Sequence, residues 1–248
     1  MNLSDLFHRI FAYNPPNPID YWQTRAASEG WSSVMWRNNT YNELVDRDQW
    51  RVIESNLPKQ RGRVLDLGCG SGRMSARLAG CFDEYVGVDL DCMVAEAHRR
   101  NPNLATKFVG ANIKEYAYPA DHFDLVLSVA CLAAACKAEE LPDITRRIAR
   151  ATRTGGKIII IEPFHLLPPL TRLCEVSHRE VVDHFRKTGV SVDKVSGMVF
   201  IPLRLLLTRP QFSHHPTFTR ISYHMGEIMR RVAPRLLSDY SVITFTKR

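Results

Sequence analysis

The segment from Val64 to Gly72 limits what this chain can fold into more than any other part of the sequence. It reads VLDLGCGSG, a short apolar run interrupted by Asp66 and followed by three alternating glycines. Glycines at this spacing let the backbone turn sharply and let a ligand approach it closely. We therefore expect a buried strand over 63–68, a tight ligand-binding loop, and a helix over 72–79.

The same segment does not match two common nucleotide-binding loops. A dinucleotide fingerprint needs a third glycine where this chain has Arg73, or Ser75 if the count starts at Gly70. A phosphate-binding Walker loop needs Gly-Lys-Ser or Gly-Lys-Thr, and neither occurs in the chain. A plain turn between strand and helix is the remaining alternative, but such a turn needs neither Asp66 nor three glycines. The loop therefore predicts a ligand other than a nicotinamide dinucleotide or a hydrolysed nucleotide.

Strands and helices are expected to alternate through the rest of the chain. Short runs of Val, Ile and Leu that are apolar on both faces are typical of parallel strands covered by helices. Near the C-terminus the pattern changes to alternation, which favours two adjacent antiparallel strands. The expected strands are 63–68, 84–90, 106–112, 123–130, 157–162, 191–199 and 240–246, and the expected helices are 41–57, 72–79, 93–100, 139–152 and 178–187. This order predicts an α/β protein with a doubly wound, seven-stranded Rossmann-like sheet.

Residues 64–72 resemble, without a gap, the first motif of the class I S-adenosylmethionine-dependent methyltransferases: two hydrophobic residues, Asp, a hydrophobic residue, then Gly-x-Gly-x-Gly. The resemblance extends over roughly residues 60–165 and is to the small-molecule branch of that family. It implies a methyltransferase sheet, an enzyme of this class, and S-adenosylmethionine as cofactor. The residues before it, rich in aromatics, Asn and Pro and followed by apolar helical spacing over 41–57, predict an N-terminal cap with a leading helix at 1–58, which leaves the methyltransferase domain at 59–248. An insertion at about 198–239, before the last strand, would cap the acceptor side.

The resemblance also implies which residues bind the cofactor. Asp66, Gly68, Cys69 and Gly70 would line its methionyl part. Asp89 ends the second strand, where a carboxylate can accept hydrogen bonds from both ribose hydroxyls, because Asp91 is the better candidate to cap the next helix. Further residues at the ends of the second, third and fourth strands would face the cofactor: Leu90, Asn112, Ile113, Ser128 and Val129.

Asn112 departs from the family pattern, which usually has Asp at this place. An acid there would accept a hydrogen bond from the adenine amino group. The amide oxygen of Asn112 can accept the same bond without a charge, so we expect recognition with a weaker contact.

Methyl transfer from a sulfonium is an in-line displacement, which needs a general base only for some acceptors. His165 follows the fifth strand at the carboxyl edge of the sheet and is our first candidate for that base. A loop histidine that is only solvated or caps a carbonyl is the alternative. The histidines in the insertion are further candidates for this base: His214, His215 and His224.

Charge and cysteine usage bear on partners and compartment. The net charge of +7 attracts polyanions, but the basic residues are scattered, so nucleic acid is an open but disfavoured partner. The fourth strand lacks the Pro-Pro motif of DNA amino-methylating relatives, and the chain has no Pro-Cys pair for pyrimidine-carbon methylation.

The six cysteines lack zinc spacing, which predicts no metal and reduced thiols. No signal-peptide core or membrane span is recognised, so a cytoplasmic protein is expected.

Three functional hypotheses follow. The favoured one is methyl transfer to a small-molecule acceptor, a hydroxyl of a sugar, a quinone or a secondary metabolite. The first alternative is an RNA methyltransferase, which is supported only by the basic excess. The second is a non-catalytic protein that binds S-adenosylmethionine, suggested by Asn112 and by the absence of a certain base. The oligomeric state stays open.

Overall fold

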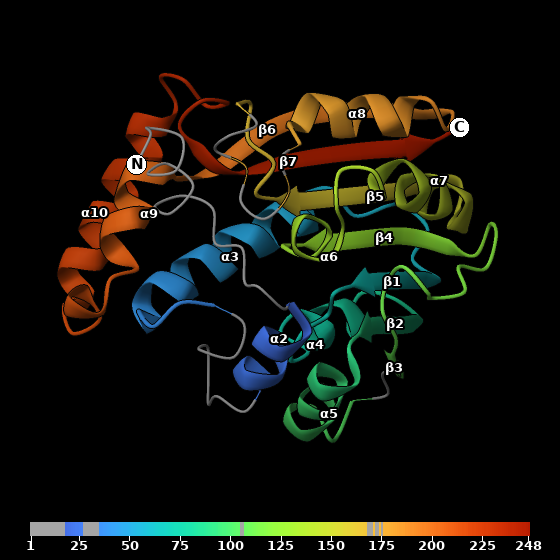
Figure 1. Ribbon diagram of the computed structural model, residues 1–248, viewed down its shortest axis with the longest axis horizontal. Coiled ribbons are helices and arrows are strands. Elements are labelled where there is room, and N and C mark those ends of the chain that lie inside the picture. The colour runs from blue at the N-terminus through green and yellow to red at the C-terminus, as the bar shows by residue number, and fades with distance from the viewer. Residues whose placement is uncertain (1–17, 27–34, 105–106, 168–170, 172–173, 175) are drawn as a thin grey trace.

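The computed structural model describes residues 18–26, 35–104, 107–167, 171, 174 and 176–248. Its centre is a seven-stranded sheet in the order β3-β2-β1-β4-β5-β7-β6 (Figure 1). The strands are β1 (Arg63–Leu67), β2 (Glu84–Asp89), β3 (Lys107–Gly110), β4 (Phe123–Val129), β5 (Thr152–Glu162), β6 (Val190–Phe200) and β7 (Ser238–Lys247). The helices are α2 (Pro18–Ala26), α3 (Asn39–Ser55), α4 (Ser75–Ala79), α5 (Asp91–Arg100), α6 (Leu132–Ala135), α7 (Leu141–Ala151), α8 (His178–Arg186), α9 (Ile201–Leu207) and α10 (Pro216–Arg230), with a 3-10 turn at Pro210–Phe212.

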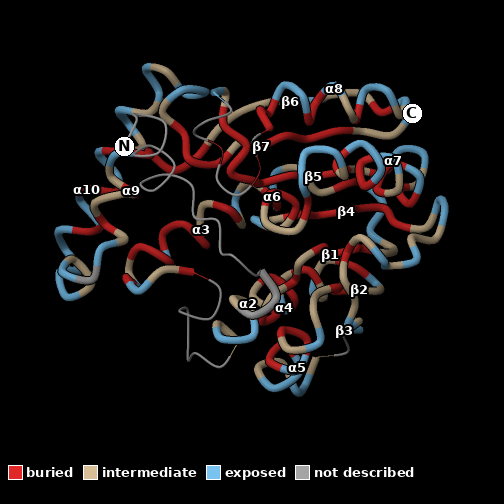
Figure 2. Tube along the Cα trace, in the orientation of Figure 1, coloured by how far each residue is buried: buried red, intermediate tan, exposed pale blue. Residues whose placement is uncertain are grey.

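The sheet is mixed in the way that the sequence predicts. Strands β1 to β5 are parallel to one another, and β7 runs antiparallel between β5 and β6. The doubly wound sheet and the antiparallel C-terminal pair are therefore confirmed. The buried positions follow β4, β5 and β7 through the middle of the molecule (Figure 2).

Both faces of the sheet are covered by apolar packing, because the central strands are apolar on both parities. One cluster joins the strands to α6, α7 and α8, for example through Leu141, Ile148 and Phe185. The other joins them to α3 and α4 and to the insertion, for example through Tyr41 and Tyr223.

The leading helix α3 packs against the insertion. Asn38, at the N-cap of α3, donates hydrogen bonds from Nδ2 to Leu207 O (3.0 Å) and to Thr219 Oγ1 (3.1 Å). The hydroxyl of Tyr223 donates to Asp48 Oδ2 at 2.9 Å. The two caps predicted from opposite ends of the chain therefore meet, and both lie beyond the carboxyl ends of the parallel strands (Figure 1).

Several predicted boundaries change. The helix after the glycine loop starts at Ser75 instead of Gly72, because residues 70–74 form a turn. Helix α7 ends at Ala151, one residue before the expected end, and Gly155, with φ of 78°, lies within β5, where its pairing with β4 changes register. Residues 1–17 and 27–34 of the N-terminal cap lie outside the described residues, and its boundary at residue 58 stays a prediction. Among the described helices, none has the length and apolar character needed to cross a membrane.

Candidate functional site

The glycine loop leaves β1 at the point where the strand order reverses, with β2 on one side and β4 on the other. Open α/β sheets bind their ligands at such a reversal, beyond the carboxyl ends of the strands. Gly68, Gly70 and Gly72 have φ values of 71°, 56° and 75°, in the left-handed region that favours glycine. A Cβ on Gly68 would lie only 2.3 Å from Cβ of Cys131, so the loop after β4 closes tightly against the loop after β1.

Asp89 joins this loop to the end of β2. Its Oδ2 accepts the backbone N–H of Gly70 at 2.7 Å, and its Oδ1 accepts that of Leu90 at 2.7 Å. Burial raises the pKa of this carboxyl, and the two N–H donors counter part of the rise. Because a carboxylate has about four acceptor positions, two remain for a ligand.

Our expectation that Asp91 caps helix α5 is wrong. The N-cap residue is Leu90, whose side chain makes no capping bond, and Asp91 is the first helical residue. Asp89 does not cap this helix either; its structural role is to hold the glycine loop through the backbone N–H of Gly70.

Asp66 lies beneath the loop on β1 and is only 3% exposed. Burial raises its pKa to about 6, while the hydrogen bond from Tyr85 and the charge of Arg73 act in the opposite direction. The hydroxyl of Tyr85 donates to Asp66 Oδ2 at 2.9 Å. Two buried carboxylates, Asp66 and Asp89, thus lie at one loop, an arrangement that favours a ligand with a positive charge.

Cys69 contributes backbone more than side chain to the loop. Its thiol is buried, and a Cβ on Gly87 of β2 would approach Sγ to 3.0 Å. Burial raises the pKa of this thiol well above its usual value, so it is a packed neutral group.

The predicted adenine-binding residues follow β2 and β3. Leu90 is half-buried, with the extended dihedral angles of an N-cap. Asn112 Oδ1 already accepts the backbone N–H of Lys114 at 3.0 Å, which leaves one acceptor position on that oxygen. Ile113 is buried in the apolar cluster below α6 and α7, where its side chain packs with the core.

The side chains at the end of β4 have partners within the protein. Ser128 is fully buried, and its hydroxyl donates to Glu162 Oε1 at 2.7 Å, so this hydroxyl is not free for a cofactor. Val129 is half-buried and packs against the apolar cluster that includes α3. Only backbone atoms of Ser128 remain as candidates for contact.

Glu162 at the end of β5 was missed by sequence reasoning. Its carboxylate accepts the backbone N–H groups of Cys131 at 2.7 Å, Leu132 at 2.9 Å and Ala133 at 3.2 Å, as well as the hydroxyl of Ser128. Burial raises its pKa, and these four donors lower it. The sequence did contain a signal for this role, because Glu162 directly follows four isoleucines of a buried strand. A carboxylate that is buried in this way needs hydrogen-bond donors within the protein. Glu162 fixes the loop that touches Gly68.

His165 does not have the surroundings of a general base. The side chain is 2% exposed. Its Nε2 lies 2.8 Å from the carbonyl oxygen of Leu236, to which it must donate, and its Nδ1 accepts the N–H of Leu167 at 3.0 Å. Both ring nitrogens are occupied, so the histidine has no lone pair free to take a proton from an acceptor. In contrast, His214, His215 and His224 are exposed on the insertion.

Arg73, which argued against a dinucleotide loop, turns away from the loop. It donates to Asp46 and, through Nη2, to Gln49 Oε1 at 2.8 Å, and Arg77 donates to Asp46 Oδ2 at 2.6 Å. Asp46 is only 4% exposed. These bonds fasten α3 to the turn and helix that follow the glycine loop, a role that no local sequence pattern indicates.

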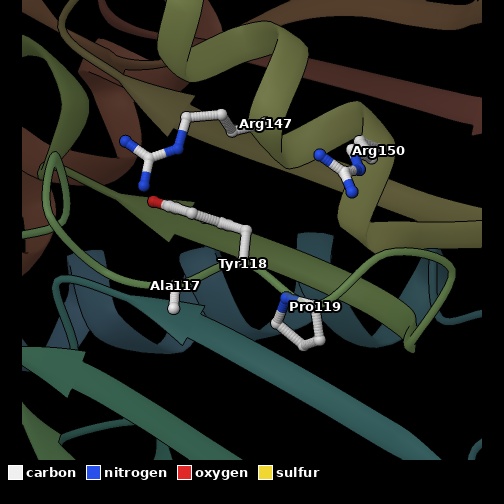
Figure 3. A pocket seen from close by; sticks show the side chains of 5 residues that line it. All are labelled: Ala117, Tyr118, Pro119, Arg147 and Arg150. Carbon is white, nitrogen blue, oxygen red and sulfur yellow. The ribbon is translucent and has the colours of Figure 1, made fainter.

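A surface pocket of about 480 Å³ lies elsewhere, lined by Ala117, Tyr118, Pro119, Arg147 and Arg150 (Figure 3). These residues precede β4 and β5, so the pocket lies towards the amino ends of these strands, opposite the glycine loop. The guanidinium of Arg147 lies 4.8 Å from the ring centroid of Tyr118 and donates to the carbonyls of Lys114 and Tyr116. These two bonds mean that the Arg147 side chain holds the loop before β4 in place. This pocket does not belong to the predicted cofactor site.

The comparisons with known proteins agree with this geometry. A family model described as a methyltransferase domain matches residues 64–156. The chain is 26% identical over 167 residues to a ubiquinone biosynthesis O-methyltransferase of Azorhizobium caulinodans, covering 57% of this chain and 64% of that protein. It is 34% identical over 143 residues to a malonyl-[acyl-carrier protein] O-methyltransferase of Enterobacter lignolyticus, covering 56% of this chain and 53% of that protein. The chain thus spans less than two thirds of the length of these curated relatives.

Solved structures show the same fold. An S-adenosylmethionine-dependent methyltransferase from Mesorhizobium loti superposes with a TM-score of 0.60 at 16% identity, covering 80% of this chain and 97% of that one. The match of the family model starts at the first residue of the glycine motif and ends within β5. The chain therefore carries a class I S-adenosylmethionine-dependent methyltransferase domain, a family whose cofactor is S-adenosylmethionine.

Proposed function

We propose that this chain transfers a methyl group from S-adenosylmethionine to an oxygen of a small-molecule acceptor, such as a hydroxyl of a sugar, a quinone or a secondary metabolite. The observation that carries the proposal is the glycine loop at the strand-order reversal, which Asp89 holds through its bond to the N–H of Gly70. Two relatives whose names describe O-methyltransferases support oxygen as the acceptor atom.

In this proposal different residues around the loop bind different parts of the cofactor. Asp66 and the backbone of Gly68, Cys69 and Gly70 bind the methionyl end, whose ammonium group suits a buried carboxylate. Asp89 accepts from the ribose hydroxyls through the positions left free by its two backbone bonds.

The adenine end is assigned to the loops after β2, β3 and β4. Leu90 packs against the ring, and Asn112 accepts from the amino group through its free acceptor position. Ile113 supports that loop from the core. Ser128 and Val129 contribute backbone.

The chemistry does not require His165. The displacement at the methyl carbon depends first on the alignment of acceptor, methyl group and sulfur, which the two loops and the caps would provide. We place this activity in the cytoplasm, because all six cysteines are free thiols, as in a reducing compartment.

Titration calorimetry with S-adenosylmethionine tests the cofactor assignment. The protein should bind in the micromolar range, and Asp89→Asn should weaken binding by tenfold to a hundredfold, or about 1.4 to 3 kcal/mol. The amide group of the variant would face a backbone N–H donor and can offer fewer acceptor positions to the ribose.

The matched control is Asp91→Asn, which removes an exposed acid two residues away and should leave binding within twofold. An S-adenosylhomocysteine analogue without ribose hydroxyls separates the loop role from the ribose role. Asp89→Asn should cost less affinity for that analogue than for the natural compound. Equal affinity of the two variants, or no binding by the unmodified protein, would refute the assignment.

Turnover with a panel of hydroxylated acceptors then separates the enzyme from a protein that only binds the cofactor. Mass spectrometry should detect the gain of one methyl group on an acceptor oxygen. Methylation of RNA instead of any small acceptor, with binding that weakens steeply as salt rises, would favour the RNA alternative.

A further inference from the structure

Helix α10 and the turn that follows it, residues 231–232, carry an apolar stripe on their outer side. The stripe consists of residues that are between 44% and 87% exposed and follow one another at helical spacing: Phe218, Ile221, Met225, Ile228, Met229 and Val232. Spacings of three, four and seven residues place these side chains on one face that is about 100° wide. Single exposed apolar residues are common on protein surfaces, but a continuous stripe marks a surface that contacts something else.

The inner side of α10 shows that this stripe is not part of the core. The helix faces the body of the protein with Thr219, Ser222, Tyr223 and Gly226, which are buried. A Cβ on Gly226 would lie 2.9 Å from Cδ1 of Leu203, so the helix packs closely through a small residue. Small and hydroxyl-bearing side chains therefore face inward, while the larger aliphatic ones face outward.

Basic side chains border the stripe along one edge. Arg220, His224 and Arg231 are exposed, and the helical period places them on neighbouring positions of the same side. Residues 209–237 contain five arginines and a single acid, Glu227. That acid is bonded to Arg230 of the same helix at 2.8 Å, with both side chains mostly buried. The exposed surface of this region thus combines apolar and cationic groups without a free carboxylate.

We propose that α10 is an interfacial helix that docks this protein on an anionic lipid bilayer surface. Helices that lie in the membrane interface have an apolar face for the acyl boundary and arginines for the lipid headgroups. The charge of the helix edge complements phosphatidylglycerol or phosphatidylserine. Because α10 lies beyond the carboxyl ends of the parallel strands, docking brings the side of the sheet that holds the glycine loop towards the membrane (Figure 1).

A second copy of this chain is the main alternative occupant, and the charges disfavour it. Two α10 helices that paired antiparallel through their stripes about a two-fold axis would bring one basic edge against the other. Arg220 and Arg231 would then face like charges, and the single acid is already paired with Arg230. An anionic surface compensates these charges, whereas a symmetrical dimer does not.

Vesicle flotation tests the proposal with the full chain. The protein should float with phosphatidylcholine vesicles that contain phosphatidylglycerol, and binding should fall with rising salt. The variant Ile221→Ser/Met225→Ser/Ile228→Ser should lose this binding. The variant Arg220→Gln/Arg231→Gln should bind more weakly by roughly 25-fold, since each arginine near an anionic surface contributes about fivefold.

The matched control for charge is Arg146→Gln/Arg186→Gln, which removes two exposed arginines from α7 and α8 and should leave vesicle binding unchanged. Circular dichroism and thermal unfolding verify that each variant is folded, and all substituted positions are on the surface. Affinity for S-adenosylmethionine should not change in any of them, which makes this test independent of the proposed function.

Three results would overturn the proposal. The first is failure of the unmodified protein to bind anionic vesicles, and the second is full binding by the serine variant. The third is a dimer in light scattering that the serine variant converts to a monomer, which would assign the stripe to a second copy.

Discussion

Replacing Asp66 by Asn should make the folded protein more stable at neutral pH while it weakens the cofactor site. Asp66 is buried on β1, where it accepts a hydrogen bond from the hydroxyl of Tyr85 at 2.9 Å. Burial raises the pKa of this carboxyl from 3.8 to about 6. Asparagine has nearly the same shape, keeps an oxygen for Tyr85, and does not ionise.

The size and sign of the effect follow from this pKa. Below pH 3.8 the carboxyl is protonated in both the folded and the unfolded chain. Between pH 3.8 and about 6 the folded chain keeps a proton that the unfolded chain releases, so the free energy of unfolding falls as pH rises. Above pH 6 both states are ionised, and the folded state is destabilised by ~3 kcal/mol relative to low pH.

Urea unfolding between pH 4 and pH 7 measures this effect, because the Asn variant lacks the titrating group. At pH 7 Asp66→Asn should unfold with a free energy up to ~3 kcal/mol higher than that of the unmodified protein, and the difference should shrink towards pH 4. Asp143→Asn, at an exposed position of α7, is the control and should show no such trend. An Asp66→Asn protein that is less stable at pH 7, or a difference that does not vary with pH, would refute the reasoning.

The same variant should bind S-adenosylmethionine more weakly, because it has lost the negative charge assigned to the methionyl ammonium. A gain in stability together with a loss of affinity is what substitution of a strained functional residue produces. Calorimetry at pH 7 measures it, and unchanged affinity would remove Asp66 from the proposed site.

Three other substitutions test the structure around the site. Gly68→Ala should cost several kcal/mol and abolish cofactor binding, because φ is 71° and the added Cβ would meet Cys131 at 2.3 Å; thermal unfolding and calorimetry measure this. Arg204→Met should cost about 3 to 5 kcal/mol in urea unfolding, since it breaks a buried ion pair by removing the guanidinium that lies 3.1 Å from the carboxylate of Asp239. Equal stability would contradict the buried ion pair. His165→Ala should cost about 2 kcal/mol through two lost hydrogen bonds and leave cofactor affinity within twofold, whereas a specific loss of methyl transfer with intact stability would restore His165 as the base.

The strands could be predicted from the sequence because buried parallel strands leave a strong local signal. The run Ile158–Ile161 is buried at every position, as are Leu125, Val126 and Leu127 on β4. Short segments that are apolar on both faces are typical of buried parallel strands. The glycines after β1 are also a strong local signal. Each of them has a positive φ that other residues adopt with difficulty, so their spacing predicted the loop.

Two of the predicted site residues have hydrogen-bond partners that are far away in the sequence. Ser128 was expected to face the cofactor, but Glu162, 34 residues later, accepts its hydroxyl. His165 was expected to be available, but the carbonyl of Leu236, 71 residues later, occupies one of its nitrogens. Position at the carboxyl edge of a sheet predicts which residues are near a ligand, but not which polar groups already have a partner within the protein.

The caps show why acceptor specificity was the least predictable part of the chain. Asn38 bonds to Leu207 and Thr219, which are 169 and 181 residues away, and Tyr223 bonds to Asp48 across 175 residues. The surface beside the carboxyl ends of the strands is therefore one packed unit that combines α3 with the insertion. An apolar pattern at helical spacing is the same whether it faces a core or a membrane. The exposure of its side chains and the burial of Thr219 and Gly226 on the opposite side show that the stripe of α10 points outward, so its partner had to be inferred from packing rather than from periodicity.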